Sequence, residues 1–138
     1  MLMNSLSIIV RHSRTFCEHK LTQFDIGFPE QIILMYLAEN RKVSQDEIAK
    51  YFLIDKGAIA KSVGKLEEKD YIERYENPED KREKLIVLSA KGKKILTYMQ
   101  KILEEWNVNF LKGLTEEDIS QFQRISDIMA TNVTNIID

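Results

Sequence analysis

The chain has 138 residues, of which 43% are hydrophobic and 30% charged, a composition typical of one soluble globular domain. Its formal net charge is −2, so any binding to nucleic acid must depend on a few placed cations and not on a generally basic surface. The single cysteine excludes an intrachain disulfide. With only two histidines besides, the sequence offers no cluster of residues suited to a metal, a cofactor or catalysis. With no signal peptide and no apolar run long enough to span a membrane, we expect a cytoplasmic protein that is not an enzyme.

Apolar periodicity predicts the first two helices. Residues 2–20 place several apolar side chains near one side of a helix, among them Leu6, Ile9 and Phe16. After a break at 25–28, Pro29 suits the first turn of a second helix over 29–40. A chain this short buries a modest fraction of its surface, so apolar helix stripes favour burial against a second copy, and we predict a dimer.

The next two helices are predicted from their caps. Ser44 and Glu47 form a capping-box pattern that opens a short helix over 45–52. Asp55 can cap another helix over 56–69, in which Ile59 begins an apolar stripe with i, i+4, i+7 spacing. Two short helices joined by a turn of about three residues are typical of a helix-turn-helix.

A β-hairpin is predicted after these helices, because residues 71–75 and 85–88 are rich in strand-forming side chains. The polar segment 77–84 between them is expected to be a long charged loop, and the hairpin is the only strand pair expected. Ser89 can cap a long helix to about Leu111, and a last helix starts at Thr115 after Gly113. The predicted fold is mainly α-helical, with a small β-hairpin wing beside the helix-turn-helix.

The outward face of helix 56–69 is the strongest candidate for a DNA-binding surface. Lys61 and Lys65 project on one side with small residues between them, and Ala58 and Ser62 lie at its margin. Small side chains let a helix approach the floor of the major groove, where lysines can contact phosphates or guanine edges. The alternative is an ordinary solvated helix face.

The charged segment of the hairpin offers further cations, namely Lys81, Arg82 and Lys84. An arginine at the tip of a wing can enter the minor groove, where the negative potential is concentrated. Asp80, two residues before Arg82, is suited to fix the direction of the arginine by a charge-assisted bond. The alternative is a charged loop with no binding partner.

Together these segments resemble the MarR family of winged helix-turn-helix transcriptional regulators. The resemblance is carried by DKGAIAK at 55–61 with LEEK at 66–69, and by DKR at 80–82 with LSAKG at 88–92. Ser89 replaces a commoner threonine, and Asp70 stands where relatives often have glycine, a position at which aspartate tolerates a left-handed backbone.

The resemblance implies a homodimer that binds double-stranded DNA at a palindromic operator. It implies an N-terminal dimerisation helix and connection over 1–28, a DNA-binding region over 29–88, and a linking helix with a C-terminal dimerisation helix over 89–138. With Asp80 as support for the wing, the implied DNA-contacting residues are Lys56, Ala58, Lys61, Ser62, Lys65, Lys81, Arg82 and Lys84.

Many members of the family release DNA when a small aromatic or anionic effector binds, so the resemblance also implies a ligand-responsive repressor. The first helix carries four candidates for such a pocket, Arg11, His12, Arg14 and His19. Their alternative role is to pair with acids at the subunit interface. Cys17 is expected to be a plain half-buried cysteine, with redox sensing as the alternative.

A different class of function stays open from the sequence alone. Residues 56–84 hold eight basic and eight acidic side chains, so a winged-helix module that binds protein and not DNA is the alternative.

Overall fold

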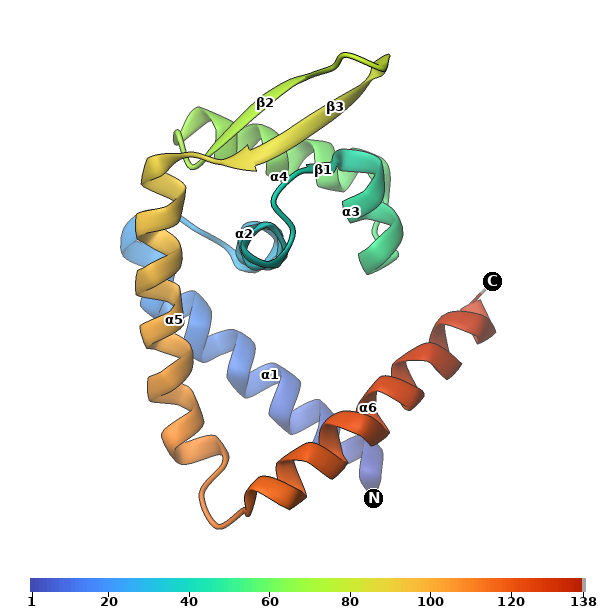
Figure 1. The fold of residues 1–138 in the computed structure, drawn as a ribbon. Helices are drawn as coiled ribbons and strands as arrows, with labels where there is room; N and C mark the ends of the chain where they lie inside the picture. The colour runs from blue at the N-terminus through green and yellow to red at the C-terminus, as the bar shows by residue number, and fades with distance from the viewer. Residues whose placement is uncertain (138) are drawn as a thin grey trace. The chain divides into compact units, whose positions relative to one another are not determined.

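The structure is a computed structural model that describes residues 1–137, with side chains described to residue 136. It is mainly helical with a small antiparallel sheet, as the sequence predicts. It divides into two compact units, Met1–Leu103 and the residues from Glu104 onward, and helix α5 (Ala90–Phe110) includes residues of both. Figure 1 shows the order of the elements along the chain.

The first unit begins with α1 (Leu2–Leu21), a 3-10 turn η1 (Thr22–Phe24) and α2 (Phe28–Glu39). Pro29 lies in the first turn of α2, where its missing N–H costs no helical bond. The chain reverses at Asp25, whose φ of 52° is left-handed. The first two predicted helices are therefore confirmed, each to within one residue at either end.

Both predicted caps of the helix-turn-helix are formed. The Ser44 hydroxyl accepts a hydrogen bond from the Glu47 amide at 3.0 Å and starts α3 (Gln45–Phe52). The Asp55 carboxylate accepts bonds from the amides of Gly57 and Ala58, at 2.9 and 3.2 Å, and starts α4 (Lys56–Glu68). Each bond satisfies an amide that has no partner within its helix.

The sheet differs from the predicted hairpin in two respects. Its order is β1-β3-β2, with β2 (Ile72–Asn77) and β3 (Asp80–Leu88) joined by a tight turn, so the expected eight-residue loop over 77–84 is wrong. A third strand, β1 (Val43–Ser44), pairs with Ile86 and Leu85 of β3. The wing extends into solvent, so segment 80–84 of β3 can carry charged residues on both faces. It lacks the apolar alternation of a half-buried strand, and for this reason the sequence did not predict it as a strand.

The core of the first unit lies where α1, α2, α4, the base of the sheet and α5 meet. In Figure 1 the α2 helix is seen end-on beneath the sheet, with α1 on its other side. The largest fully buried side chains are apolar except for one, the capping serine: Leu21, Ile33, Leu34, Ile48, Leu66, Ile86, Met99, Val63 and Ser44. The stripe predicted on helix 56–69 is thus confirmed as the core-facing side of α4.

The junction between the sheet and α5 is fixed by a cap and a close approach. Ser89 Oγ accepts a bond from the Gly92 amide at 2.9 Å and donates to the Asp70 carbonyl. Asp70 has a φ of 62°, which confirms the left-handed turn expected there. A Cβ on Gly92 would lie 2.0 Å from the Tyr71 carbonyl oxygen, so only glycine fits.

The second unit contains α6 (Glu116–Ile137), which begins with reciprocal bonds between Thr115 and Asp118. Several large apolar side chains of α6 are exposed in the single chain: Phe122, Ile125, Ile128, Val133 and Ile136. Among the described residues, no helix has the length and apolar character that crossing a membrane requires.

Candidate nucleic-acid interface

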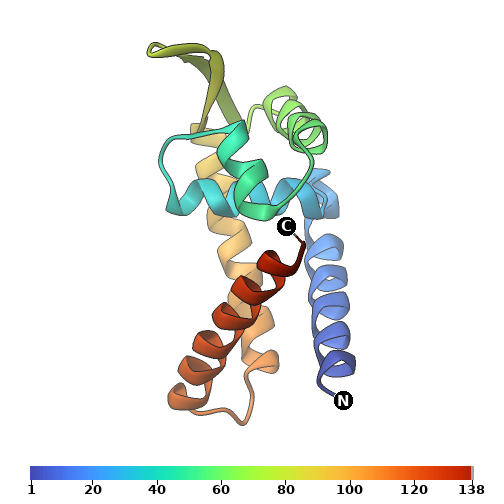
Figure 2. The ribbon, with the colours of Figure 1, turned by 90° about the vertical axis from the view of Figure 1, so that its right-hand side faces the viewer.

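Helix α4 lies beside α3 and beneath the wing, with its core-facing stripe against α2 and β2. Figure 2 shows α4 and the wing at the same end of the first unit. Lys56, Lys61 and Lys65 are exposed, while Ile59, Val63 and Leu66 are buried. Lys61 and Lys65 therefore project from the side opposite the core, and Lys56 is exposed in the first turn of the helix.

The small side chains of α4 are placed less uniformly than the sequence predicts. Ala58 is exposed, and a Cβ on the half-buried Gly64 would meet nothing within 4 Å. Ser62 is only 9% exposed, so it is more buried than its expected place at the groove-facing margin implies. Ser62 lines a pocket of about 310 Å³ between α4 and the start of α2, and the start of α2 lies beside this flank of α4.

Two of the three lysines of α4 lie close to carboxylates of neighbouring helices. Lys56 Nζ is 3.6 Å from Asp46 Oδ1 of α3, and both side chains are largely exposed. Lys65 Nζ is 4.0 Å from Glu30 Oε1 of α2, whose side chain is only 7% exposed. The structure gives Lys61 no ion pair within residues 1–137.

The tip of the wing holds its arginine in the way the sequence suggests. Asp80 Oδ1 accepts from the Arg82 amide at 3.1 Å and from Arg82 Nε at 3.3 Å. The Arg82 side chain is 93% exposed, so it projects into solvent although one carboxylate orients it. Lys81 is exposed, and Lys84 Nζ lies 3.5 Å from Glu76 Oε1 across the strands.

The turn of the wing is stabilised by its own side chains. Asn77 Oδ1 accepts from the Glu79 amide at 3.0 Å, and Asn77 Nδ2 donates to Glu83 Oε2 at 2.8 Å. The first bond closes the turn, and the second ties β2 to β3 where the ladder is irregular, between Glu76 and Asn77. The cations of the wing are thus carried by an ordered hairpin.

Arg74 of β2 is a structural residue that the sequence analysis did not identify. Its guanidinium donates to both carboxylate oxygens of Glu67 on α4, at 2.9 and 3.3 Å, and to Gln45 Oε1 on α3 at 2.9 Å. Such charge-assisted bonds are stronger than neutral ones and have a defined geometry. One side chain therefore connects the wing to both helices of the helix-turn-helix.

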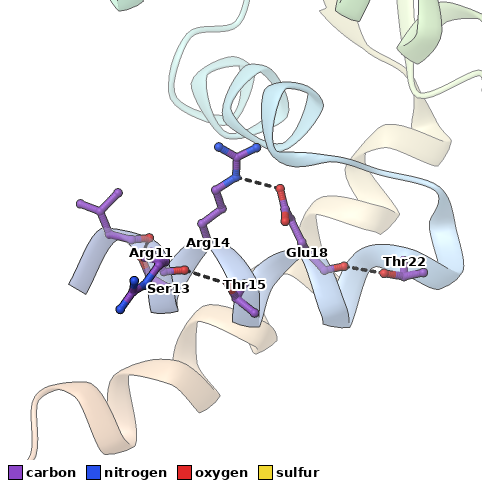
Figure 3. Close-up of polar contacts among 7 residues, drawn as sticks. Arg11, Ser13, Arg14, Thr15, Glu18 and Thr22 are labelled. Atoms are coloured by element: carbon purple, nitrogen blue, oxygen red, sulfur yellow. Dashed lines mark hydrogen bonds and ion pairs between the residues drawn. The ribbon is translucent and has the colours of Figure 1, made fainter. Parts of the chain in front are cut away.

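Two of the four effector candidates on α1, Arg11 and Arg14, point in different directions. Arg14 Nε donates to Glu18 Oε1 at 2.9 Å, and its guanidinium lies over the Phe28 ring at 4.9 Å from the centroid. Figure 3 shows Arg14 directed toward α2 and Arg11 directed away from it. Arg11, His12 and His19 are all exposed. Their role in binding an effector stays a prediction.

Another cleft lies elsewhere in the first unit. It has a volume of about 590 Å³, and residues of α2, β3 and α5 form its walls. None of the four α1 candidates lines it; its lining residues are Leu37, Ala38, Arg41, Val87, Leu88, Lys93 and Leu96. Cys17 of α1 is 6% exposed and belongs to the apolar core, so it is more deeply buried than expected.

Comparison with known proteins identifies the family. Residues 24–83 match the sequence profile of the MarR family. The regulator BilQ of Clostridium symbiosum, an HTH-type transcriptional regulator, is 31% identical over 106 residues, which cover 77% of this chain and 74% of that protein. The chain belongs to the MarR family. It is therefore a winged helix-turn-helix transcriptional regulator, as the motifs at 55–69 and 80–92 predict.

Two further MarR-type proteins are similar over almost the whole chain. The HTH-type transcriptional repressor IacR of Pseudomonas putida is 25% identical over 119 residues, which cover 86% of this chain and 71% of that protein. A MarR family regulator from Listeria monocytogenes, solved in complex with a 26-mer DNA, has the same fold with a TM-score of 0.90. That match has 20% identity and covers 96% of this chain and 89% of the other.

Proposed function

We propose that this MarR family protein binds double-stranded DNA sequence-specifically, with α4 in the major groove and the wing in the adjacent minor groove. The observation that carries the proposal is the pairing of three exposed lysines on α4 with an oriented, 93% exposed arginine on the wing. The proposed contacts are Lys56, Ala58, Lys61 and Lys65 of α4 and Lys81, Arg82 and Lys84 of the wing, with Asp80 as support.

We further propose that the functional form is a homodimer on a palindromic operator. The exposed apolar side chains of α6, and Leu2, Met3, Ile8 and Val10 on α1, are surfaces that a second copy would remove from water. A two-fold symmetric protein binds two half-sites related by the same symmetry. The proposed location is the cytoplasm, where a regulator meets its operator.

Repression that a ligand relieves is the regulatory mode we propose. The similarity to the repressor of Pseudomonas putida supports the direction of regulation. For the effector, cationic side chains of α1 beside apolar surface suit a small aromatic or anionic molecule, and these are Arg11, His12, Arg14 and His19.

The proposal is tested by measuring DNA affinity against salt. Fluorescence anisotropy with operator DNA selected from random sequence should give a binding constant whose logarithm falls linearly with the logarithm of salt. The slope should be about 0.9 for each phosphate neutralised. Absence of binding to selected or genomic fragments at micromolar protein and low salt would favour the winged-helix protein-interaction module instead.

Replacement of the wing arginine tests the contact itself. Arg82→Ala should weaken operator binding by about 1–3 kcal/mol, because it removes a groove contact without altering the core. Lys101→Ala is the matched control: it removes one exposed positive charge from α5, outside the proposed DNA-contacting and effector residues, and should leave affinity unchanged. Equal affinity of Arg82→Ala and wild type would show that the wing does not bind the groove.

A further inference from the structure

A buried carboxylate lies directly behind the proposed DNA-contacting face. Glu30 is in the first turn of α2, and its side chain is only 7% exposed. It folds back toward the start of its helix, since a Cβ on Gly27 would lie 3.1 Å from Glu30 Oε2. There the amide dipoles of the helix favour a negative charge.

Lys65 of α4 is the partner that the structure gives this carboxylate. Its Nζ lies 4.0 Å from Glu30 Oε1, and both residues line the pocket of about 310 Å³ between α2 and α4. The Lys65 side chain is 51% exposed, so its ammonium lies at the boundary between the buried acid and the solvent that DNA would replace.

The Lys65 ammonium cannot contact Glu30 and a DNA phosphate at the same time. An ammonium that turns outward to a DNA phosphate moves away from Glu30 and leaves a buried carboxylate without a counter-charge. Because an unpaired buried charge is costly, part of the gain from the phosphate contact is lost. Asp46 differs in this respect: it is largely exposed, and water can solvate it when Lys56 moves away.

We propose that Glu30 is a positioning residue that lowers the DNA affinity of this protein by competing with DNA phosphate for Lys65. The inference rests on the proposed function, because it requires Lys65 to contact DNA. It assigns to α2, a helix outside the recognition surface, a direct influence on the strength of operator binding.

A double-mutant cycle on operator DNA tests the proposal, with Glu30→Gln, Lys65→Gln and the combined variant. Glu30→Gln keeps the size of the side chain while removing the charge. It should tighten operator binding by about two- to five-fold per protomer, the range expected for an exposed or half-exposed ion pair. In the Lys65→Gln background the same change should leave the affinity unaltered.

Glu39→Gln is the matched control, since it removes one exposed acid from the other end of α2, away from Lys65. The structure gives Glu39 no ion pair within residues 1–137. Its effect on affinity should be the same with and without Lys65. If Glu30→Gln also acts equally in both backgrounds, or does not tighten binding, Glu30 does not act through Lys65 and the proposal is wrong.

A second variant covers the case in which Glu30→Gln does not fold, as judged by thermal unfolding. Glu30→Asp keeps the charge near the start of α2 but withdraws the carboxylate from Lys65 by one methylene. It should tighten binding in the same direction, and unchanged or weaker binding would contradict the proposal. A wild-type protein that binds no DNA would instead refute the proposed function, which separates the two failures.

Discussion

At the scale of single residues, the junction between the wing and α5 is held by a hydrogen bond and a close backbone approach. The Tyr71 carbonyl accepts a bond from the Ser89 amide at 3.1 Å and lies against the bare Cα of Gly92. The serine cap and the glycine thus act together, one by bonding the first turn of α5 and the other by letting the backbone of residue 71 approach it. The LSAKG motif at 88–92 therefore needs a capping residue at Ser89 and a glycine at position 92.

Gly92→Ala should therefore be destabilising. The new methyl would lie 2.0 Å from a backbone oxygen, and overpacking of this kind costs about 1–3 kcal/mol of unfolding free energy. Gly64→Ala is the matched control in α4, where a Cβ meets nothing and helix propensity should raise stability by about 0.5–1 kcal/mol. Urea unfolding of both variants measures the change in the free energy of unfolding. A Gly92→Ala variant as stable as wild type would contradict the close approach of Gly92 to the Tyr71 carbonyl.

Ser62 shows where prediction at the residue scale fails. It lies about 60° around the helix from the centre of the stripe formed by Ile59, Val63 and Leu66, a position from which either burial or exposure is possible. The start of α2 covers that flank, and the periodicity of α4 alone contains no information about its neighbour. Lys61 and Lys65 were predicted correctly as exposed, because they project away from the stripe on the other side of the helix.

At the scale of elements, helices were predictable because their signals are local. The caps Ser44, Asp55 and Ser89 each mark a helix start, and the structure forms all three bonds. The strand β1 was missed because its two residues are defined only by pairing with β3, some forty positions later. The outer half of the wing was missed because strands solvated on both faces lack an apolar alternation.

The start of α6 gives a prediction about pH at the same scale. The pKa of Asp118 is lowered by the backbone amide of Thr115, which donates to its carboxylate at 2.9 Å, and further by the hydroxyl of that residue. A lowered folded-state pKa gives stability that is present above the unfolded-state value of 3.8 and is lost as the pH falls through the folded-state value.

Asp118→Asn should accordingly lower the melting temperature at pH 7, and the difference from wild type should shrink as the pH falls below about 4. Glu116→Gln is the control, because it removes a charge from the same helical turn and leaves the bonds between Thr115 and Asp118 intact. Melting curves between pH 2 and 7 are the measurement. A difference that does not depend on pH would mean that the charge of Asp118 has no part in the cap.

At the scale of the whole molecule, the exposed apolar side chains of α6 favour association of two chains, and the oligomeric state is the property to measure. Burial of one such side chain stabilises an interface by about 1.5–3 kcal/mol. Ile125 and Phe122 are 44% and 51% exposed in the single chain. We expect sedimentation to give twice the 16.2 kDa of one chain.

Ile125→Lys should shift the protein toward the monomer, because a lysine cannot remain desolvated within an apolar interface. Ser120→Lys is the control, since it adds the same charge to an exposed position on the opposite face of α6. Sedimentation velocity over a range of concentrations distinguishes the two. A monomeric wild type, or a dimer that Ile125→Lys leaves intact, would contradict α6 as the dimerisation surface.

The incomplete pairing of the wing has a consequence for solubility. β1 pairs with only two residues of β3, so the outer half of β3 and the free side of β2 both present unpaired strand edges. Such edges can recruit the strand of another molecule and begin aggregation. Both strands carry charges along these edges, from Glu73 to Glu76 on β2 and from Lys81 to Lys84 on β3. These charges oppose intermolecular sheet formation at the edges of the wing, because pairing with another strand would bring charged side chains together.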